Sequence, residues 1–202
     1  GIPELKQAVC RKFKSENDID YQPSEITVSS GCKQLLFNAL MATLNRGDEV
    51  IIPAPYWVSY SAMVEIADGR PIIIPCAAEQ QFKLTPDKLE SAVTSATRWL
   101  ILNSPSNPTG AVYTRSELLA LAEVLLQHPE ILVITDDIYE HLIYGDVEFA
   151  TLAQVEPRLK ERTLTCNGMS KAYCMTGWRI GFAGGPESLV RAMAKLQSHS
   201  SF

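Results

Sequence analysis

The chain has 202 residues and a formal net charge of -5, with 46% hydrophobic and 20% charged residues. These values are typical of a soluble globular protein with one domain or slightly more and a sizeable core. The acidic balance, without any run of lysine and arginine, argues against nucleic acid or an anionic membrane as a partner.

Nothing in the sequence points to secretion or to a membrane span. No apolar stretch approaches the roughly 20 residues that a membrane-spanning helix needs. The chain opens in the style of a helix start, with Pro3 in a favoured first-turn position and no signal peptide before it. We therefore expect a cytoplasmic protein, and we expect this chain to be part of a longer one.

The five cysteines argue for free thiols. None forms a C-x-x-C pair, and none has metal-ligand spacing with the three histidines. An odd number of cysteines in apolar settings is typical of reduced thiols in the cytosol. We therefore expect neither a disulfide framework nor a metal site.

The predicted elements alternate between helix and strand along the chain. In the first half we expect helices at 3–14, 35–44 and 56–67, strands at 26–28, 49–53 and 71–75, and a short helix from 86. In the second half we expect strands at 98–102, 131–135, 163–166 and 178–183, a helix that ends at 127, and another after 186. Thr114 and Glu117 form a capping box for the helix that ends at 127, and 144–162 is expected to be less regular.

The strand pattern predicts an α/β fold. The strands are short and apolar without strict alternation, which is typical of strands that are covered on both faces. Strands that alternate with helices predict a three-layer αβα sandwich around a mostly parallel, seven-stranded sheet. The last strand follows its predecessor without a helical crossover, so we expect it to be the one antiparallel member.

A lysine and an arginine near the end of the chain suggest a reactive site. Lys171 lies in a run of small and apolar residues, which favour a neutral amine that can attack a carbonyl. Arg179 carries a planar fork suited to phosphate. An amine that attacks a carbonyl and an arginine that binds phosphate match the two ends of pyridoxal phosphate (PLP). The alternative is a lysine that lies along an apolar surface with its amine in water.

Other unusual residues follow strands, where ligands bind in such sheets. Gly31 permits close backbone approach at a helix N-terminus, where free amides bind phosphate, and Lys33 adds a charge. Asp136 could hold a proton on a pyridine nitrogen, and Tyr139 could point at the same ring. The alternative for Gly31 and Lys33 is an ordinary strand-to-helix turn. The alternative for Asp136 is a salt bridge.

Two more residues are ambiguous from the sequence. Trp57 could stack on an aromatic ring or anchor its own helix in the core. The amide of Asn107 can both donate and accept hydrogen bonds, or it can serve simple turn chemistry.

Together, these segments resemble the PLP-dependent aminotransferases of fold type I, in the class that contains aspartate aminotransferase. The matching stretches are 30–34, 55–60, 103–110, 136–141 and 171–179. The subgroup that the chain resembles most contains bacterial-type aspartate and prephenate aminotransferases.

The resemblance implies a role for each candidate residue. Lys171 would form a Schiff base with PLP and move the Cα proton, and Asp136 would pair with the pyridinium nitrogen. Tyr139 and Asn107 would hydrogen-bond the 3-oxygen of the ring, Trp57 would stack on the ring, and Arg179, Lys33 and the amides of Gly31 and Cys32 would hold the phosphate. The resemblance also implies cis peptide bonds at Ala54–Pro55 and Asn107–Pro108.

The implied activity is transamination between an amino acid such as aspartate and a 2-oxo acid such as 2-oxoglutarate, in a homodimer. Residues 1–202 would be the PLP-binding large domain, without the N-terminal arm and the C-terminal small domain of the family. Two alternatives on the same fold are a PLP-dependent lyase or synthase and a non-catalytic PLP-binding regulator domain. A nicotinamide-binding sheet is disfavoured because no G-x-G-x-x-G follows the first strand.

The chain departs from the family pattern at three positions. Gly168 stands where many members carry a phosphate-binding serine, and Ser170 is a candidate to replace that contact. Cys32 and Cys174 stand where glycine or alanine is common.

Overall fold

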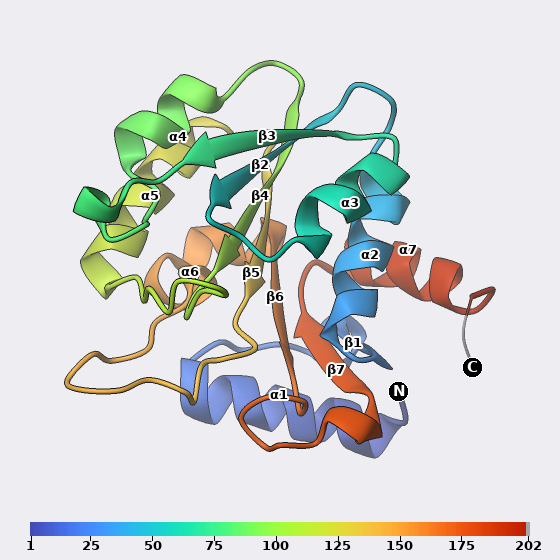
Figure 1. Ribbon diagram of the computed structural model, residues 1–202. Helices are drawn as coiled ribbons and strands as arrows, with labels where there is room; N and C mark the ends of the chain where they lie inside the picture. The colour runs from blue at the N-terminus through green and yellow to red at the C-terminus, as the bar shows by residue number, and fades with distance from the viewer. Residues whose placement is uncertain (201–202) are drawn as a thin grey trace.

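The computed structural model describes residues 1–200, which form an α/β structure around a sheet of seven strands (Figure 1). The strands are β1 (Ile26–Ser30), β2 (Glu49–Ala54), β3 (Arg70–Pro75), β4 (Thr97–Asn103), β5 (Leu132–Asp136), β6 (Thr163–Gly168) and β7 (Ile180–Gly184). Their order across the sheet is β1-β7-β6-β5-β4-β2-β3.

Within residues 1–200, β7 is the one antiparallel strand of the sheet, as predicted. It pairs antiparallel with β1 on one side and with β6 on the other, whereas the remaining pairs are parallel. A parallel neighbour would need a crossover, usually an α-helix, after β6, and residues 169–179 contain only the 3-10 turn Thr176–Trp178. The carboxyl ends of the parallel strands and the amino end of β7 therefore share one edge of the sheet.

Helices cover both faces of the sheet, which gives three layers (Figure 1). One face carries α2 (Cys32–Thr43), α3 (Ser59–Ile66) and α7 (Glu187–Gln197), and the other carries α1 (Pro3–Asn17), α4 (Pro86–Ala92), α5 (Arg115–Gln127) and α6 (Leu152–Val155). The 3-10 turns are η1 (Pro23–Glu25), η2 (Ala78–Gln80), η3 (Pro157–Arg162) and η4 (Thr176–Trp178). The predicted three-layer αβα sandwich is confirmed.

Alternate residues of the central strands face opposite helical layers. In β4, Trp99 and Ile101 belong to the core beneath α2 and α3, whereas Leu100 and Leu102 belong to the core beneath α4 and α5. None of the four is more than 3% exposed. Burial on both faces explains why these strands are apolar without alternation.

Two elements begin later than predicted. The helix expected at 56–67 begins at Ser59, so Trp57 lies in the β2–α3 connection. The strand expected at 178–183 begins at Ile180, because Trp178 ends η4 and Arg179 has a left-handed backbone with φ 54°. A left-handed residue interrupts an extended strand. This turn places Arg179 at the carboxyl edge of the parallel strands.

Three further findings bear on the sequence expectations. The peptide bonds Ala54–Pro55 and Asn107–Pro108 are cis, as the resemblance implied, and Ser104–Pro105 is cis as well. The segment 144–162, expected to be irregular, contains α6 and η3. Among residues 1–200, no helix has both the length and the apolar character needed to cross a membrane.

Candidate active site

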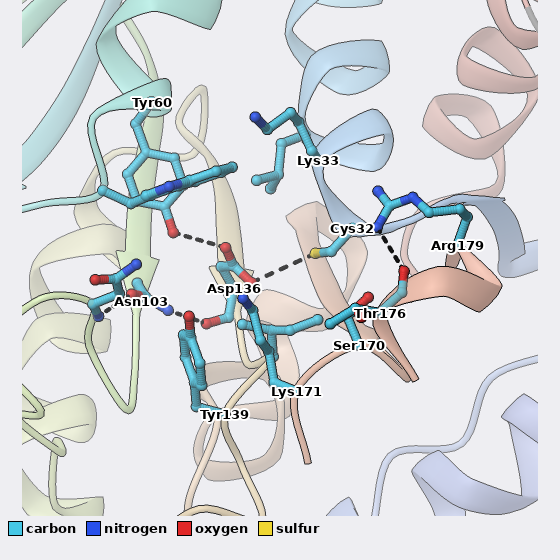
Figure 2. A pocket seen from close by; sticks show the side chains of 14 residues that line it. Cys32, Lys33, Tyr60, Asn103, Asp136, Tyr139, Ser170, Lys171, Thr176 and Arg179 are labelled. Atoms are coloured by element: carbon cyan, nitrogen blue, oxygen red, sulfur yellow. Dashed lines mark hydrogen bonds between the residues drawn. The ribbon is translucent and has the colours of Figure 1, made fainter. Parts of the chain in front are cut away.

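A cavity of about 290 Å³ lies at the edge of the sheet where the parallel strands end (Figure 2). It is lined by Cys32, Lys33, Leu36, Trp57, Tyr60, Asn103, Asn107, Asp136, Ile138, Tyr139, Ser170, Lys171, Thr176 and Arg179. Eight of the nine site residues predicted from the sequence are in this lining. The ninth, Gly31, lies against the guanidinium of Arg179. The fold therefore brings the predicted residues together.

Asp136 is the buried acid of the cavity wall. It is the last residue of β5 and is 4% exposed. Burial raises the pKa of its carboxyl, while hydrogen bonds from Tyr60 and Cys32 and the charge of Lys171 oppose that rise. A carboxylate held in this way can keep a proton on a basic ring nitrogen that is presented to it.

Three side chains hydrogen-bond Asp136. The hydroxyl of Tyr60 donates to Oδ2 at 2.7 Å, and the thiol of Cys32 donates to Oδ1 at 3.5 Å (Figure 2). Burial and the neighbouring Asp136 charge raise the pKa of Tyr60 well above its ordinary value, so its phenol keeps its proton. The amide of Asn103 donates to the backbone oxygen of Asp136 at 2.7 Å.

Asn103 also positions the loop that follows β4. It is paired in register with Asp136 across β4 and β5. Its Oδ1 accepts a hydrogen bond from the backbone N–H of Asn107 at 2.8 Å. The side-chain amide of Asn103 therefore connects the end of β4 with the end of β5 and with the loop that contains Asn107.

Tyr139 provides a protonated phenol in the cavity. Burial and the Asp136 charge raise its pKa, and a hydrogen bond with the side chain of Asn107 opposes that rise. The phenol is therefore neutral at neutral pH and can donate to a ligand oxygen. The Nζ atom of Lys171 lies 5.9 Å from the centre of the Tyr139 ring.

Lys171 follows β6 and its side chain extends toward Asp136 (Figure 2). Lys171 is exposed, so its apolar neighbours in sequence do not bury it, in agreement with the alternative of an amine that reaches water. Its loop faces the open cavity, and the neighbouring Tyr173 and Cys174 are exposed as well. The amine is therefore accessible to a ligand in the cavity.

Gly31, Arg179 and the start of α2 lie close together, and their chemistry suits an anion. Gly31 caps α2 with φ 83°, and a Cβ atom there would lie 2.4 Å from Nη2 of Arg179. The guanidinium is held by bonds that it donates to the backbone oxygens of Ser30 at 3.4 Å and Thr176 at 3.1 Å. A fixed cation beside free helix amides is a suitable phosphate site.

Lys33 and Trp57 are neighbours in the cavity lining. The Nζ atom of Lys33 lies 4.7 Å from the centre of the Trp57 ring, a cation–π contact. Trp57 also makes an edge-to-face contact with Tyr60, with ring centres 5.5 Å apart. Both readings of Trp57 hold in part, because it precedes α3 and lines the cavity but also packs against the core beneath α2 and α3.

The departure from the family at Gly168 has a steric explanation. A Cβ atom on Gly168 would lie 2.9 Å from the backbone oxygen of Ile180, so a serine there would collide with β7. Ser170, two positions later, lines the cavity. It is therefore the residue placed to supply the hydroxyl.

Sequence reasoning missed Tyr60, Asn103 and Thr176 as site residues. Tyr60 has the apolar spacing of Trp57 and Met63 within the helix expected at 56–67, so its position suggests a core residue. Asn103 carried a usable signal, because it is a polar residue at the carboxyl end of an apolar strand, as Asp136 is. Thr176 contributes its backbone oxygen to Arg179, and side-chain patterns do not reveal such contacts.

A second group of charged residues lies outside the cavity. Glu16, Glu140 and His141 offer ligand atoms within 4.8 Å of one another. The amine of Lys12 contacts Glu140 and lies 3.5 Å from Glu16. Because this lysine already balances the carboxylates, we assign no metal to the group.

Comparison with known proteins identifies the family of this fold and site. The model of the family described as aminotransferase class I and II matches residues 1–202. The chain is 61% identical over 201 residues to the aspartate/prephenate aminotransferase of Cereibacter sphaeroides, covering 100% of this chain and 50% of that protein. It is 57% identical over 201 residues to an aspartate aminotransferase of Rhizobium meliloti, covering 100% of this chain and 49% of that protein.

Solved structures that are similar to this chain include aspartate aminotransferases. The crystal structure of the aspartate aminotransferase from Rhizobium meliloti matches with a TM-score of 0.98 and 57% identity, over 99% of this chain and 50% of that chain. The aspartate aminotransferase from Thermus thermophilus with maleate matches with a TM-score of 0.94 and 45% identity, over 99% of this chain and 51% of that chain.

The chain belongs to the aminotransferase class I and II family. The resemblance inferred from its motifs is thereby confirmed. The chain spans about half the length of the curated relatives that it matches.

The cavity suits PLP, the cofactor associated with this family. PLP presents an aldehyde, a basic ring nitrogen and a phosphate. The cavity offers the amine of Lys171, the buried carboxylate of Asp136 and the anion site at Arg179. Each group of the cofactor therefore has a chemically matched partner in the lining.

Proposed function

We propose that the protein transfers amino groups between an amino acid and a 2-oxo acid, with PLP attached at Lys171. One observation carries this proposal: an accessible lysine, a buried acid and an arginine beside a helix N-terminus surround one cavity. The names of the matched relatives support amino-group transfer as the reaction.

When bound, PLP supplies an aldehyde that captures the substrate amino group and a ring that takes up the electrons released at Cα. Lys171 would hold the cofactor between turnovers and would move the proton from the substrate Cα. Its exposed amine faces the cavity, so a substrate amino group can displace it. The same amine, once free, is in place to act as base and acid.

Asp136 would face the ring nitrogen and keep its proton in place. A protonated nitrogen makes the ring a stronger electron acceptor. Burial strengthens this interaction, because a charge in a low-dielectric site is poorly screened by water.

The remaining residues would orient the ring. Tyr139 and Asn107 would hydrogen-bond the ring oxygen, and Trp57 would lie against the ring face. Arg179, Lys33 and the amides of Gly31 and Cys32 would hold the phosphate, with Ser170 as a further donor.

We propose aspartate or a similar amino acid as donor and 2-oxoglutarate as acceptor. The relatives named aspartate or aspartate/prephenate aminotransferase support this choice. The Thermus thermophilus structure contains maleate, a dicarboxylate, which is chemically close to both compounds.

We also propose that the protein is a cytoplasmic homodimer in which residues 1–202 form the cofactor-binding large domain. Exposed large apolar side chains support the dimer: Val58 is 77% exposed, Ile66 63% and Trp178 70%. Large apolar groups left open to water are typical of surfaces that are covered in an assembly. Sedimentation should show twice the monomer mass, and a monomer at micromolar concentration would contradict the dimer.

The test of function uses the protein expressed at its full natural length, as do the experiments below. Wild-type protein with PLP, aspartate and 2-oxoglutarate should form oxaloacetate and glutamate. Lys171→Ala should reduce this rate to background, whereas Lys195→Ala, which changes an exposed lysine of α7, should not. Wild-type turnover in Lys171→Ala would overturn the proposal, and ammonia release without glutamate would favour the lyase alternative.

A further inference from the structure

The thiol of Cys32 is a second side-chain donor to the buried acid of the cavity. Its Sγ atom lies 3.5 Å from Oδ1 of Asp136, while the hydroxyl of Tyr60 donates to Oδ2 at 2.7 Å. The two donors come from different elements, Cys32 from the first turn of α2 and Tyr60 from the first turn of α3 (Figure 2). Both oxygens of the carboxylate are therefore held by side chains.

Side-chain donors on both oxygens hold the plane of the carboxylate. The terminal torsion of an aspartate has a broad, two-fold preference, so packing of the chain alone leaves the carboxylate plane free to turn. Tyr60 and Cys32 each hold one oxygen, and the backbone N–H of Ile138 is a third donor to the carboxylate. A carboxylate has about four acceptor sites, so one remains for a group in the cavity.

Cys32 is suited to donate and unsuited to attack. Contact with the thiol of Cys166, burial and the charge of Asp136 raise the pKa of Cys32 well above its ordinary value. The thiol therefore keeps its proton at neutral pH. Because the thiolate is the reactive form of cysteine, this thiol is a poor nucleophile.

We propose that Cys32, together with Tyr60, is a positioning residue that orients the Asp136 carboxylate toward the ring nitrogen of the cofactor. The inference rests on the proposed function, because it assumes that PLP occupies the cavity. It is separate from the role suggested for the backbone amide of Cys32 at the phosphate.

The test compares Cys32→Ala, which removes the donor, with Cys32→Ser, which restores a donor of similar size. Both variants keep the backbone amide. Cys10→Ala is the matched control, since Cys10 is a partly buried thiol of α1 outside the cavity. The readouts are the Kd for PLP, from its absorbance, and kcat and KM for amino transfer.

Loss of one hydrogen bond to a charged group predicts that Cys32→Ala raises the Kd for PLP about threefold to tenfold and lowers kcat by a similar factor, with KM within about twofold. Cys32→Ser and Cys10→Ala should stay within about twofold of wild type in all three constants. A packing role would instead make the alanine and serine variants alike. That outcome, or wild-type constants in Cys32→Ala, would overturn the inference.

A failure of the proposed function would look different. In that case wild-type protein itself would form no borohydride-reducible PLP adduct at Lys171. If the wild-type adduct forms and Cys32→Ala behaves as wild type, only the role of Cys32 is wrong.

Discussion

The hydroxyl of Tyr60 donates a 2.7 Å hydrogen bond to Oδ2 of Asp136, 76 positions further along the chain. Tyr60 is 2% exposed and Asp136 is 4% exposed, so water does not compete for this bond. The bond joins α3 to the end of β5 and holds the acid on which the proposed cofactor site depends.

Tyr60→Phe should destabilise the protein because it leaves a buried carboxylate oxygen with one donor fewer. The expected loss in unfolding free energy at neutral pH is about 1–3 kcal/mol. Tyr144→Phe is the control, since Tyr144 is 87% exposed. Denaturant unfolding measures both, and equal losses in the two variants would show that the buried bond contributes nothing.

Gly31→Ala should displace Arg179 and weaken the phosphate site. Gly31 has φ 83°, and the added Cβ would lie 2.4 Å from Nη2 of Arg179. Gly47→Ala imposes a similar backbone strain at φ 93° with nothing within 4 Å of the new Cβ. Both variants should lose about 1 kcal/mol of stability from the backbone.

Only Gly31→Ala should also weaken the binding of PLP. Equilibrium titration with PLP separates the two effects. If Gly31→Ala and Gly47→Ala bind PLP with the same Kd, the close approach of Arg179 to the start of α2 is not used for binding.

Arg179→Ala should raise the Kd for PLP about tenfold to a hundredfold, because it removes charge-assisted hydrogen bonds to the phosphate. Arg179→Lys should recover only part of the affinity, since lysine lacks the planar fork. Arg191→Ala, which removes an exposed i,i+4 pair with Glu187 on α7, is the control. Inorganic phosphate should compete with PLP in the wild type and far less in Arg179→Ala; equal competition would place the phosphate elsewhere.

Asp137→Asn should change how stability depends on pH. Asp137 is 3% exposed, and burial raises its pKa well above the ordinary value of 3.8. The folded state therefore binds this proton more tightly than the unfolded state. The resulting stabilisation is complete below pH 3.8 and is lost as the pH rises through the folded pKa, at up to about 1.4 kcal/mol per pH unit.

The asparagine variant carries no charge and should lose less stability than the wild type as the pH rises above 4. At pH 8 it should therefore gain stability relative to wild type. Asp146→Asn, at an exposed position, should follow the wild-type profile. Unfolding free energies measured from pH 4 to 8 provide the comparison, and parallel profiles for Asp137→Asn and wild type would contradict the buried-charge argument.

Much of the fold was predictable because it follows from local sequence patterns. The alternation of apolar strands and amphipathic helices predicted the three layers, and the lack of a helical crossover before β7 predicted its antiparallel direction. The start of α3 was not predictable in this way. The apolar spacing of Trp57 continues that of Tyr60 and Met63, but Trp57 precedes the helix and lines the cavity as well as packing against the same core.

The candidate site was predictable where residue type and position at a strand end suffice, as for Asp136. The Tyr60 contact was not, because it depends on how α3 packs against the end of β5. For Lys171 the sequence left two readings open. Its exposure agrees with the reading in which the amine reaches water, since its apolar neighbours in sequence do not enclose it in space. The role expected for Asn107 came from the family resemblance, because its residue type alone is equally compatible with a simple turn.

The most direct test of the central claim is the absorbance spectrum of the purified protein with PLP, before and after borohydride reduction, followed by peptide mapping. The proposal predicts a visible band that borohydride removes and a stable adduct that maps to Lys171. Absence of the band in folded protein, or an adduct on another lysine, would contradict the assignment of this cavity as a PLP site.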